Sequence, residues 1–240
     1  MASAAMTEIF EGNLTNIAYI FGQKLNPRPN SKPIPIVFVI SDDIFQQGSL
    51  KSLISRQGWQ LQTFESAREF LARPRPLVPS CLILALSPDD LNGLEVQKQI
   101  ARERAEVPII VISGDGDVPT TVQAMKAGAV DFLVTPFSNQ VLLVGIRESL
   151  DRSRLALHRE MEISDLRDSY ASLSRRERQV MMLVVSGLLN KQVGGELGIS
   201  EITVKAHRRQ VMQKMKANSL PDLVRMAAKL QPAAQAIHLA

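Results

Sequence analysis

The sequence predicts an α/β fold, a doubly wound five-stranded parallel sheet, followed by an all-α four-helix domain. Two observations lead to this prediction. Between residues 34 and 150, short runs rich in Val, Ile and Leu alternate with stretches of helical periodicity. Such alternation is typical of successive β-α units, which form a parallel sheet. From residue 173 onward the strand-like runs stop, and apolar residues recur at helical spacing only.

The expected strands are continuous apolar runs, which are typical of strands buried on both faces. They are expected at residues 34–40, 59–64, 81–86, 108–113 and 129–135. Helices are expected around Leu50–Ile54 and at residues 94–100, 120–127 and 139–150. In sheets of this kind function gathers at the carboxyl ends of the strands, so we expect functional residues of this domain there.

The chain divides into five expected segments: an extension (1–33), the sheet domain (34–150), a helical connector (151–172), the helical domain (173–231) and a tail (232–240). The extension ends in the proline-rich stretch NPRPNSKP, which suits neither a helix nor a central strand. The connector has many charges and no proline or glycine. A near-heptad apolar stripe leaves a coiled-coil contact between two copies open. Its members are Leu150, Leu157, Met161, Leu166 and Leu173.

Charge is distributed unevenly along the chain. Residues 173–240 carry 11 Lys and Arg against 4 Asp and Glu, whereas residues 1–172 carry 17 against 20. A basic module attached to a slightly acidic body favours a nucleic-acid partner. No apolar run approaches the roughly 20 residues of a membrane-spanning helix, and no secretion signal is evident. Cys81 lies in the apolar run CLILAL and is expected to be a packed core thiol, which fits a cytoplasmic protein.

Several classes of enzyme are disfavoured by the absence of their motifs. The sequence shows no Cys/His metal spacing, no phosphate-cradling glycine loop and no Ser/His/Asp constellation. We therefore expect no enzymatic activity, no cofactor and no bound metal.

The helical domain contains a series of residues that mark the starts and ends of helices. Ser174 and Glu177 have the spacing of a capping box, which satisfies the free amides at the start of a helix. That helix is expected to stop at Gly187, and a short second helix is expected from Asn190 to Gly198. Ser200 can cap a third, basic helix over residues 201–215. A short helix, a glycine turn and a capped basic helix predict a helix-turn-helix, whose last element lies in the major groove of DNA.

Residues 173–215 resemble the LuxR-type module of FixJ and NarL regulators along their whole length. Three motifs of that family occur in order: L-[ST]-x-R-E-x-x-V, G-x-x-N-K-x-[IV] and [IL]-S-x-x-T-V-K-x-H. The resemblance implies binding of double-stranded DNA and regulation of transcription. It also implies that residues 218–230 are the family's fourth helix, through which such modules pair on DNA.

The matching positions suggest roles for individual side chains. Lys205 and Arg209 lie one helical turn apart and are the expected contacts to base edges. Thr203, Asn190 and Lys191 are expected to hold phosphates. Two further residues belong to the predicted DNA-binding set, Arg208 and His207. For His207, packing, a phosphate contact and a base contact all remain open. The dimerisation candidates, which could equally be intramolecular core, are Leu220, Leu223, Val224 and Ala227.

Residues 36–150 resemble the phosphoacceptor receiver domain of the same regulators. Its landmarks here are VISDDIF, NGLE at 92–95, ISGDGD at 112–117 and MKAGAVDFL…PF at 125–137. A working receiver needs a phosphoacceptor aspartate after the third strand and an acidic pair that binds Mg²⁺ after the first. It also needs a hydroxyl after the fourth strand and a lysine before the Pro-Phe pair.

Most of these groups are missing from the matching positions. Ala85 stands eight residues before Gly93, where the family has its phosphoacceptor. The acidic pair is Ser41 followed by Asp42, and Thr135 occupies the lysine position. The positions that match are Ser113, in the hydroxyl slot, and Phe132, in the aromatic switch slot. The sequence therefore predicts a pseudo-receiver, which keeps the fold without the phosphorylation switch.

Three functions remain open. The first is a DNA-binding transcription regulator that acts as a homodimer, independently of aspartate phosphorylation. The second is a conventional phosphorylation-controlled regulator that uses a non-standard aspartate. The third is an antagonist or docking protein, which pairs with a competent regulator or occupies a sensor kinase.

Overall fold

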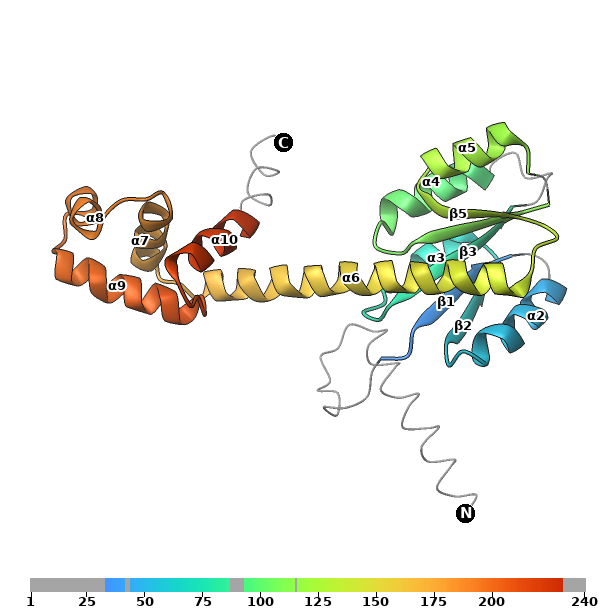
Figure 1. The fold of residues 1–240 in the computed structure, drawn as a ribbon, viewed down its shortest axis with the longest axis horizontal. Coiled ribbons are helices and arrows are strands. Elements are labelled where there is room, and N and C mark those ends of the chain that lie inside the picture. The colour runs from blue at the N-terminus through green and yellow to red at the C-terminus, as the bar shows by residue number, and fades with distance from the viewer. Residues whose placement is uncertain (1–32, 42–43, 87–92, 115, 231–240) are drawn as a thin grey trace, which may run out of the picture. The chain divides into compact units, whose positions relative to one another are not determined.

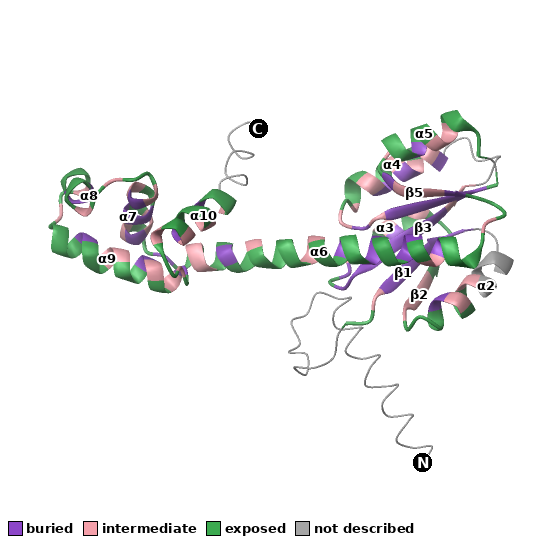
Figure 2. Cartoon of the chain, viewed as in Figure 1, coloured by how far each residue is buried: buried purple, intermediate pink, exposed green. Residues whose placement is uncertain are grey.

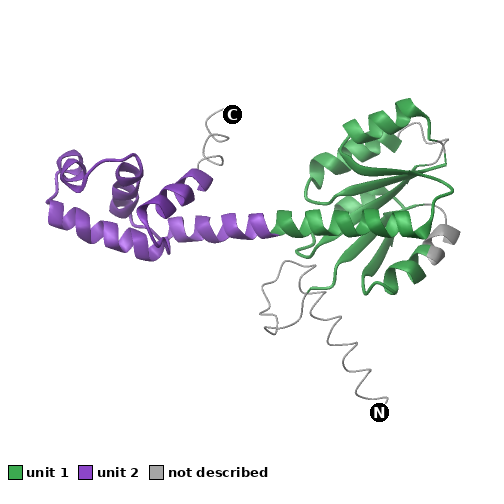
Figure 3. Cartoon of the chain, in the orientation of Figure 1, with its two compact units in different colours: residues 1–157 green, residues 158–240 purple. Residues whose placement is uncertain are grey.

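The computed structural model describes residues 33–41, 44–86, 93–114 and 116–230. Nearly all of the expected extension, Asp42 and the expected tail lie outside these residues. The chain forms two compact units, residues 1–157 and 158–240 (Figure 3). Each unit is described by itself below.

The first unit is built around a five-stranded sheet in which all neighbouring strands run parallel (Figure 1). The strand order is β2-β1-β3-β4-β5. This order confirms the predicted doubly wound sheet, whose crevice lies where the order reverses, between β1 and β3. The strands are β1 (Ile36–Ile40), β2 (Gln60–Phe64), β3 (Ser80–Leu86), β4 (Ile109–Ser113) and β5 (Ala129–Val134).

Helices pack on both faces of the sheet and bury two separate apolar clusters (Figure 2). One cluster takes Phe70, Ile100 and Ala124 from three helices. These helices are α3 (Ala67–Ala72), α4 (Gly93–Glu103) and α5 (Val118–Lys126). The other cluster takes Ile54 and Leu142 from two helices. These are α2 (Ile44–Ser55) and α6 (Asn139–Ala171). Every strand therefore has apolar contacts above and below the sheet.

Two details of the first unit bear on the sequence predictions. Helix α3 is not predicted by apolar periodicity, but the Ser66 side chain caps it by accepting a hydrogen bond from the Glu69 amide. Cys81 is fully buried in the second cluster, as expected. Its burial raises the pKa of the thiol, which remains protonated at neutral pH.

Helix α6 is a single helix of 33 residues that contributes side chains to both units. Leu150 is buried in the core of the first unit, whereas Leu166 and Leu173, the latter just past the end of the helix, are buried in the core of the second. Met161 lies between them and is 65% exposed. The near-heptad stripe in the sequence is thus explained at both ends by packing within the chain.

The second unit contains helices only and confirms the predicted all-α domain (Figure 1). Its four complete helices are α7 (Arg175–Val185), α8 (Asn190–Leu197), α9 (Glu201–Lys214) and α10 (Leu220–Leu230). The last turns of α6 pack against them through Leu166 and Tyr170. None of the described helices combines the length and apolar character needed to cross a membrane.

Candidate functional site

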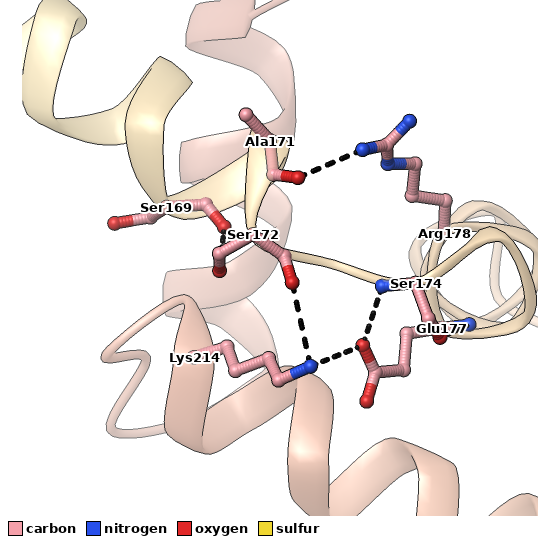
Figure 4. A network of polar contacts seen from close by, with 7 residues as sticks. All are labelled: Ser169, Ala171, Ser172, Ser174, Glu177, Arg178 and Lys214. Atoms are coloured by element: carbon pink, nitrogen blue, oxygen red, sulfur yellow. Dashed lines mark hydrogen bonds and ion pairs between the residues drawn. The ribbon is translucent and has the colours of Figure 1, made fainter.

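The capping box predicted at the start of α7 is present and is tied to the third helix. The Ser174 hydroxyl accepts from the Glu177 amide at 3.2 Å, and the Ser174 amide donates to a Glu177 carboxylate oxygen at 2.7 Å. The same oxygen accepts from the Lys214 ammonium at 2.7 Å (Figure 4). The hydrogen bonds from Lys214 and from the Ser174 backbone lower the pKa of Glu177, which is only 6% exposed. A buried carboxylate is therefore held ionised between α7 and α9.

Further contacts from Lys214 and Arg178 attach the end of α6 to this network (Figure 4). Lys214 also approaches the Ser172 carbonyl oxygen at 3.4 Å. Arg178 donates to the Ala171 carbonyl oxygen at 2.8 Å and lies over the Tyr170 ring, 5.4 Å from its centroid. Cationic side chains near a helix C-terminus satisfy its free carbonyl groups and interact favourably with the helix dipole. The start of α7 and the end of α9 are thereby fixed to the last turn of α6.

The turn between α8 and α9 depends on two glycines and one serine. Gly198 has φ +64° and ψ +36°, the left-handed conformation that glycine adopts without strain. At Gly194, an added Cβ would lie 2.7 Å from the Ile199 carbonyl oxygen, so only glycine permits this close approach. The Ser200 hydroxyl then accepts from the Thr203 amide at 3.1 Å and starts α9. This local chemistry fixes α9 against α8 as a helix-turn-helix.

Helix α9 buries one face and exposes the other. Val204 and Val211 are buried against the rest of the unit. A spacing of 100° per residue puts four exposed residues opposite this buried face, and the exposed Lys205 beside them. The four are Ile202, Ala206, Arg209 and Gln213. The two predicted base readers thus share one exposed face, and Lys205 pairs with Glu201 at 3.0 Å there.

The other cations predicted on α9 have partners inside the unit. Arg208 is half-buried and donates to the Asn190 side-chain oxygen at 3.1 Å, which links α9 to the first residue of α8. Lys214 belongs to the Glu177 network described above. Both are therefore structural cations in the free protein, and the exposed cations of α9 that face outward opposite its core are Lys205 and Arg209.

The remaining predicted DNA-binding residues surround this face. Thr203 is exposed, and its hydroxyl lies 2.8 Å from that of Ser200. Lys191 is exposed at the start of α8, and His207 is half-buried on α9. A phosphate role remains a prediction for Thr203, Asn190 and Lys191.

The dimerisation candidates on α10 fall into two groups. Leu223 and Ala227 are buried in the core of the unit, at 0% and 8% exposure, and the half-buried Leu220 packs against the same core. These three residues are thus part of the intramolecular core, which is one of the two alternatives that the sequence left open. Val224 is 40% exposed and remains available to a partner.

In the first unit, four of the positions compared with a receiver site lie at the carboxyl edge of the sheet. Ala85 is near the end of β3 and pairs with Ile112 of β4. Ser113 ends β4, and its carbonyl oxygen accepts from the Thr135 amide at 2.9 Å. Ser41 follows β1 directly and is 4% exposed. The groups that meet at this edge are thus a methyl group and hydroxyls, without a carboxylate or amine at these four positions.

The last receiver position belongs to the core rather than to this edge. Phe132 on β5 is half-buried and packs against the cluster under α4 and α5. Among the described residues, no three His, Cys, Asp or Glu side chains are grouped closely enough to hold a metal ion.

Sequence reasoning missed two residues of the second unit. Lys214 lies on the part of α9 that the sequence assigns to basic residues together with Lys205, Arg208 and Arg209, and no local pattern shows that it pairs with the buried Glu177. Ile202 was not singled out, yet it is 80% exposed on the outer face of α9. Its position 180° from the α9 core residues follows from helical geometry and could have been found from the sequence.

Comparisons with known proteins agree with this geometry. Residues 37–147 match the family of response regulator receiver domains, and residues 171–227 match the family of bacterial regulatory proteins, luxR family. Nodulation protein W of Bradyrhizobium diazoefficiens is 47% identical over 195 residues, 81% of this chain and 86% of that protein. Transcriptional regulatory protein FixJ of Azorhizobium caulinodans is 42% identical over 199 residues, 83% and 93% of the two chains.

A solved structure extends the likeness to three dimensions. The structure of the response regulator StyR has 40% sequence identity to this chain and a TM-score of 0.72. It covers 82% of this chain and 99% of StyR. The shared order of the two domains, and the identity across both, show that the chain belongs to the response regulators of the FixJ/NarL type, with a receiver domain followed by a LuxR-type DNA-binding domain.

Proposed function

We propose that this transcriptional regulator binds DNA as a homodimer and that its binding does not depend on phosphorylation of an aspartate. The observation that carries the proposal is the methyl group of Ala85 at the carboxyl edge of the sheet. A methyl group has no oxygen that can take a phosphoryl group. The neighbouring Thr135 has no positive charge to stabilise one.

DNA binding is proposed through the exposed face of α9. Lys205 and Arg209 project from it one helical turn apart, which suits contacts to the O6 and N7 atoms of guanine in the major groove. The turn of α8 and α9 is fixed by Gly194, Gly198 and the Ser200 cap, so these two cations are presented on a rigid support.

Phosphorylation is tested on the full chain with acetyl phosphate and Mg²⁺. We expect the intact mass to stay unchanged and the affinity for a selected DNA duplex to stay the same. The duplex is obtained by selection from a random-sequence pool with the untreated protein. A stable phosphoryl adduct within residues 36–150, accompanied by tighter DNA binding, would establish the conventional phosphorylation-controlled mechanism instead.

Homodimer formation is supported by exposed apolar side chains on α5. Val118, Val122 and Met125 recur at helical spacing and are 75%, 44% and 45% exposed. A second copy of the chain, which carries the same surface, can cover them in a symmetric contact. The neighbouring β5 is an edge strand of the sheet, with a free side for close approach.

The dimer is tested by sedimentation equilibrium of the untreated protein. We expect a dimer for the wild type and a monomer for Val122→Glu, because a charge at a buried symmetric contact is repeated on both copies. Val224→Glu on α10 is the matched control, and we expect it to remain a dimer in the absence of DNA. A wild type that is monomeric at all concentrations contradicts the homodimer. Dissociation by Val224→Glu alone assigns the contact to α10.

A further inference from the structure

One apolar side chain on the DNA-binding unit has no partner within the chain. Ile202, the second residue of α9, is 80% exposed. That is the highest exposure of any large hydrophobic side chain in the described part of the chain. It belongs to none of the apolar clusters, and its side chain has no polar atom to satisfy the free amides of the first turn and no charge to interact with the helix dipole. Packing and helix capping therefore do not account for it.

The position of Ile202 is fixed by its surroundings. The Ser200 cap sets where α9 begins, and the buried Val204 and Val211 set which way the helix is turned. Helical geometry then places Ile202 on the side opposite the core, between the directions of Ala206 and Arg209, with Lys205 beyond Arg209. The exposed face of α9 thus offers two apolar side chains with two cations along one side of them, and Ile202 lies at the end of the helix that enters the major groove first.

The major groove contains one apolar group, the C5 methyl of thymine. If Lys205 and Arg209 contact guanine, the outer face of α9 lies against the base edges. Ile202 on that face then contacts either a thymine methyl group or a polar base edge. Contact with a methyl removes both apolar surfaces from water, whereas contact with a polar edge strips water from that edge without replacing its hydrogen bonds.

We propose that Ile202 is a specificity-determining residue that selects thymine by contact with its C5 methyl group, beside the base pair that Lys205 or Arg209 reads. This proposal rests on the proposed binding of DNA through α9. It adds a residue that carries no charge and forms no hydrogen bond, so its effect is separable from the electrostatic part of binding.

The test uses the full chain and a duplex selected by the wild-type protein from a random-sequence pool. Each thymine of the selected duplex is replaced in turn by deoxyuridine, which differs from thymidine only by the missing methyl group. We expect one thymine in each half-site at which the wild-type protein loses about fourfold in affinity, because burying one methyl-sized group corresponds to about that factor.

Two variants assign the methyl contact. Ile202→Ala should bind the thymine duplex about fourfold or more weakly and should no longer distinguish thymine from uracil at that position. Ile202→Val keeps a branched apolar side chain and should keep the discrimination. Lys205→Ala is the matched control: it should bind more weakly overall and still distinguish thymine from uracil. Thermal unfolding by circular dichroism should be unchanged in both Ile202 variants, because the side chain is exposed.

The outcomes separate the two proposals. Discrimination that persists in Ile202→Ala, or its absence at every thymine in the wild type, overturns the role of Ile202. A wild type that selects no sequence, or a selected affinity that survives removal of both Lys205 and Arg209, overturns DNA reading by α9 instead.

Discussion

The carboxyl edge of the sheet and the exposed face of α9 differ in the side chains that they carry. The sheet has the complete parallel order and both buried clusters, yet the positions at its edge carry the methyl of Ala85 and the hydroxyls of Ser41 and Thr135. The face of α9 has both its support and its charged side chains, Lys205 and Arg209. A fold depends on buried residues, whereas a function depends on a few exposed ones, so the two can vary separately.

The largest expected effect is on DNA affinity. The double variant Lys205→Ala/Arg209→Ala removes the two proposed base contacts, and a contact of this kind contributes about 1–3 kcal/mol of discrimination. We expect specific affinity for the selected duplex to fall about a thousandfold, measured by fluorescence anisotropy at fixed salt. The single variant Lys191→Ala, at an expected phosphate contact, should weaken binding to selected and random duplexes alike. An equal loss on both duplexes for the double variant would contradict base reading.

The next effect concerns the support of α9. In Gly194→Ala the new Cβ lies 2.7 Å from the Ile199 carbonyl oxygen, so the turn must shift. We expect the second unit to lose about 2–3 kcal/mol of its free energy of unfolding, by urea denaturation followed by circular dichroism. Gly195→Ala is the matched control, because nothing lies within 4 Å of its added Cβ. It should stabilise the helix by about 0.5–1 kcal/mol, and equal effects at the two positions would count against the close approach.

A smaller effect is expected at the buried carboxylate. Glu177→Gln leaves the Lys214 ammonium without its charged partner and should cost about 1–2 kcal/mol of stability at pH 7. The pKa of Glu177 is lowered in the folded state, so its ionised form stabilises the fold above the unfolded pKa, near 4.3, and this contribution is lost as the pH falls through the folded pKa. The stability difference between wild type and variant should therefore shrink in acid.

The exposed pair of Lys205 and Glu201 provides the comparison for that experiment. Glu201→Gln removes an ion pair whose side chains are 61% and 46% exposed. Exposed pairs contribute little, so its stability should match the wild type within about 0.5 kcal/mol at every pH. A larger loss of stability in Glu201→Gln than in Glu177→Gln would contradict the expectation that the buried carboxylate contributes more than the exposed one.

The smallest expected effect is at the sheet edge. Ala85→Asp restores one carboxylate but leaves Ser41 and Thr135 in place, so Mg²⁺ and the phosphoryl oxygens still lack their partners. We expect little or no phosphoryl adduct after treatment with acetyl phosphate, measured by intact mass. The combined variant Ala85→Asp/Ser41→Asp/Thr135→Lys is the control and should form more adduct. Full phosphorylation of Ala85→Asp alone would show that one substitution is enough to make this edge of the sheet a phosphorylation site.

The fold was predictable because its signals are local. Buried parallel strands give continuous apolar runs, and the Ser174 and Ser200 caps mark helix starts in the sequence itself. Helix α3 escaped prediction because six residues span too few turns to show a period. Its only local sign was the Ser66 cap.

The sequence predicted which helix carries the candidate site, but not which of its cations are exposed and which have partners inside the unit. The spacing of Lys205 and Arg209 predicted that they share one side of the helix. The neighbouring sequence contains no signal that distinguishes them from Lys214 and Arg208. Those two cations are assigned by partners 37 and 18 residues away, Glu177 and Asn190. Contacts between elements decide which charges remain free for a ligand, and periodicity within one element does not contain that information.

The way α6 ends has a practical consequence for dissecting this protein. Leu166 and Tyr170 belong to the core of the second unit, and the Ala171 and Ser172 carbonyl groups accept bonds from Arg178 and Lys214. A fragment that begins at Leu173 would expose apolar surface and leave both cations without these acceptors. A fragment that keeps these contacts therefore has to start inside α6, before Leu166.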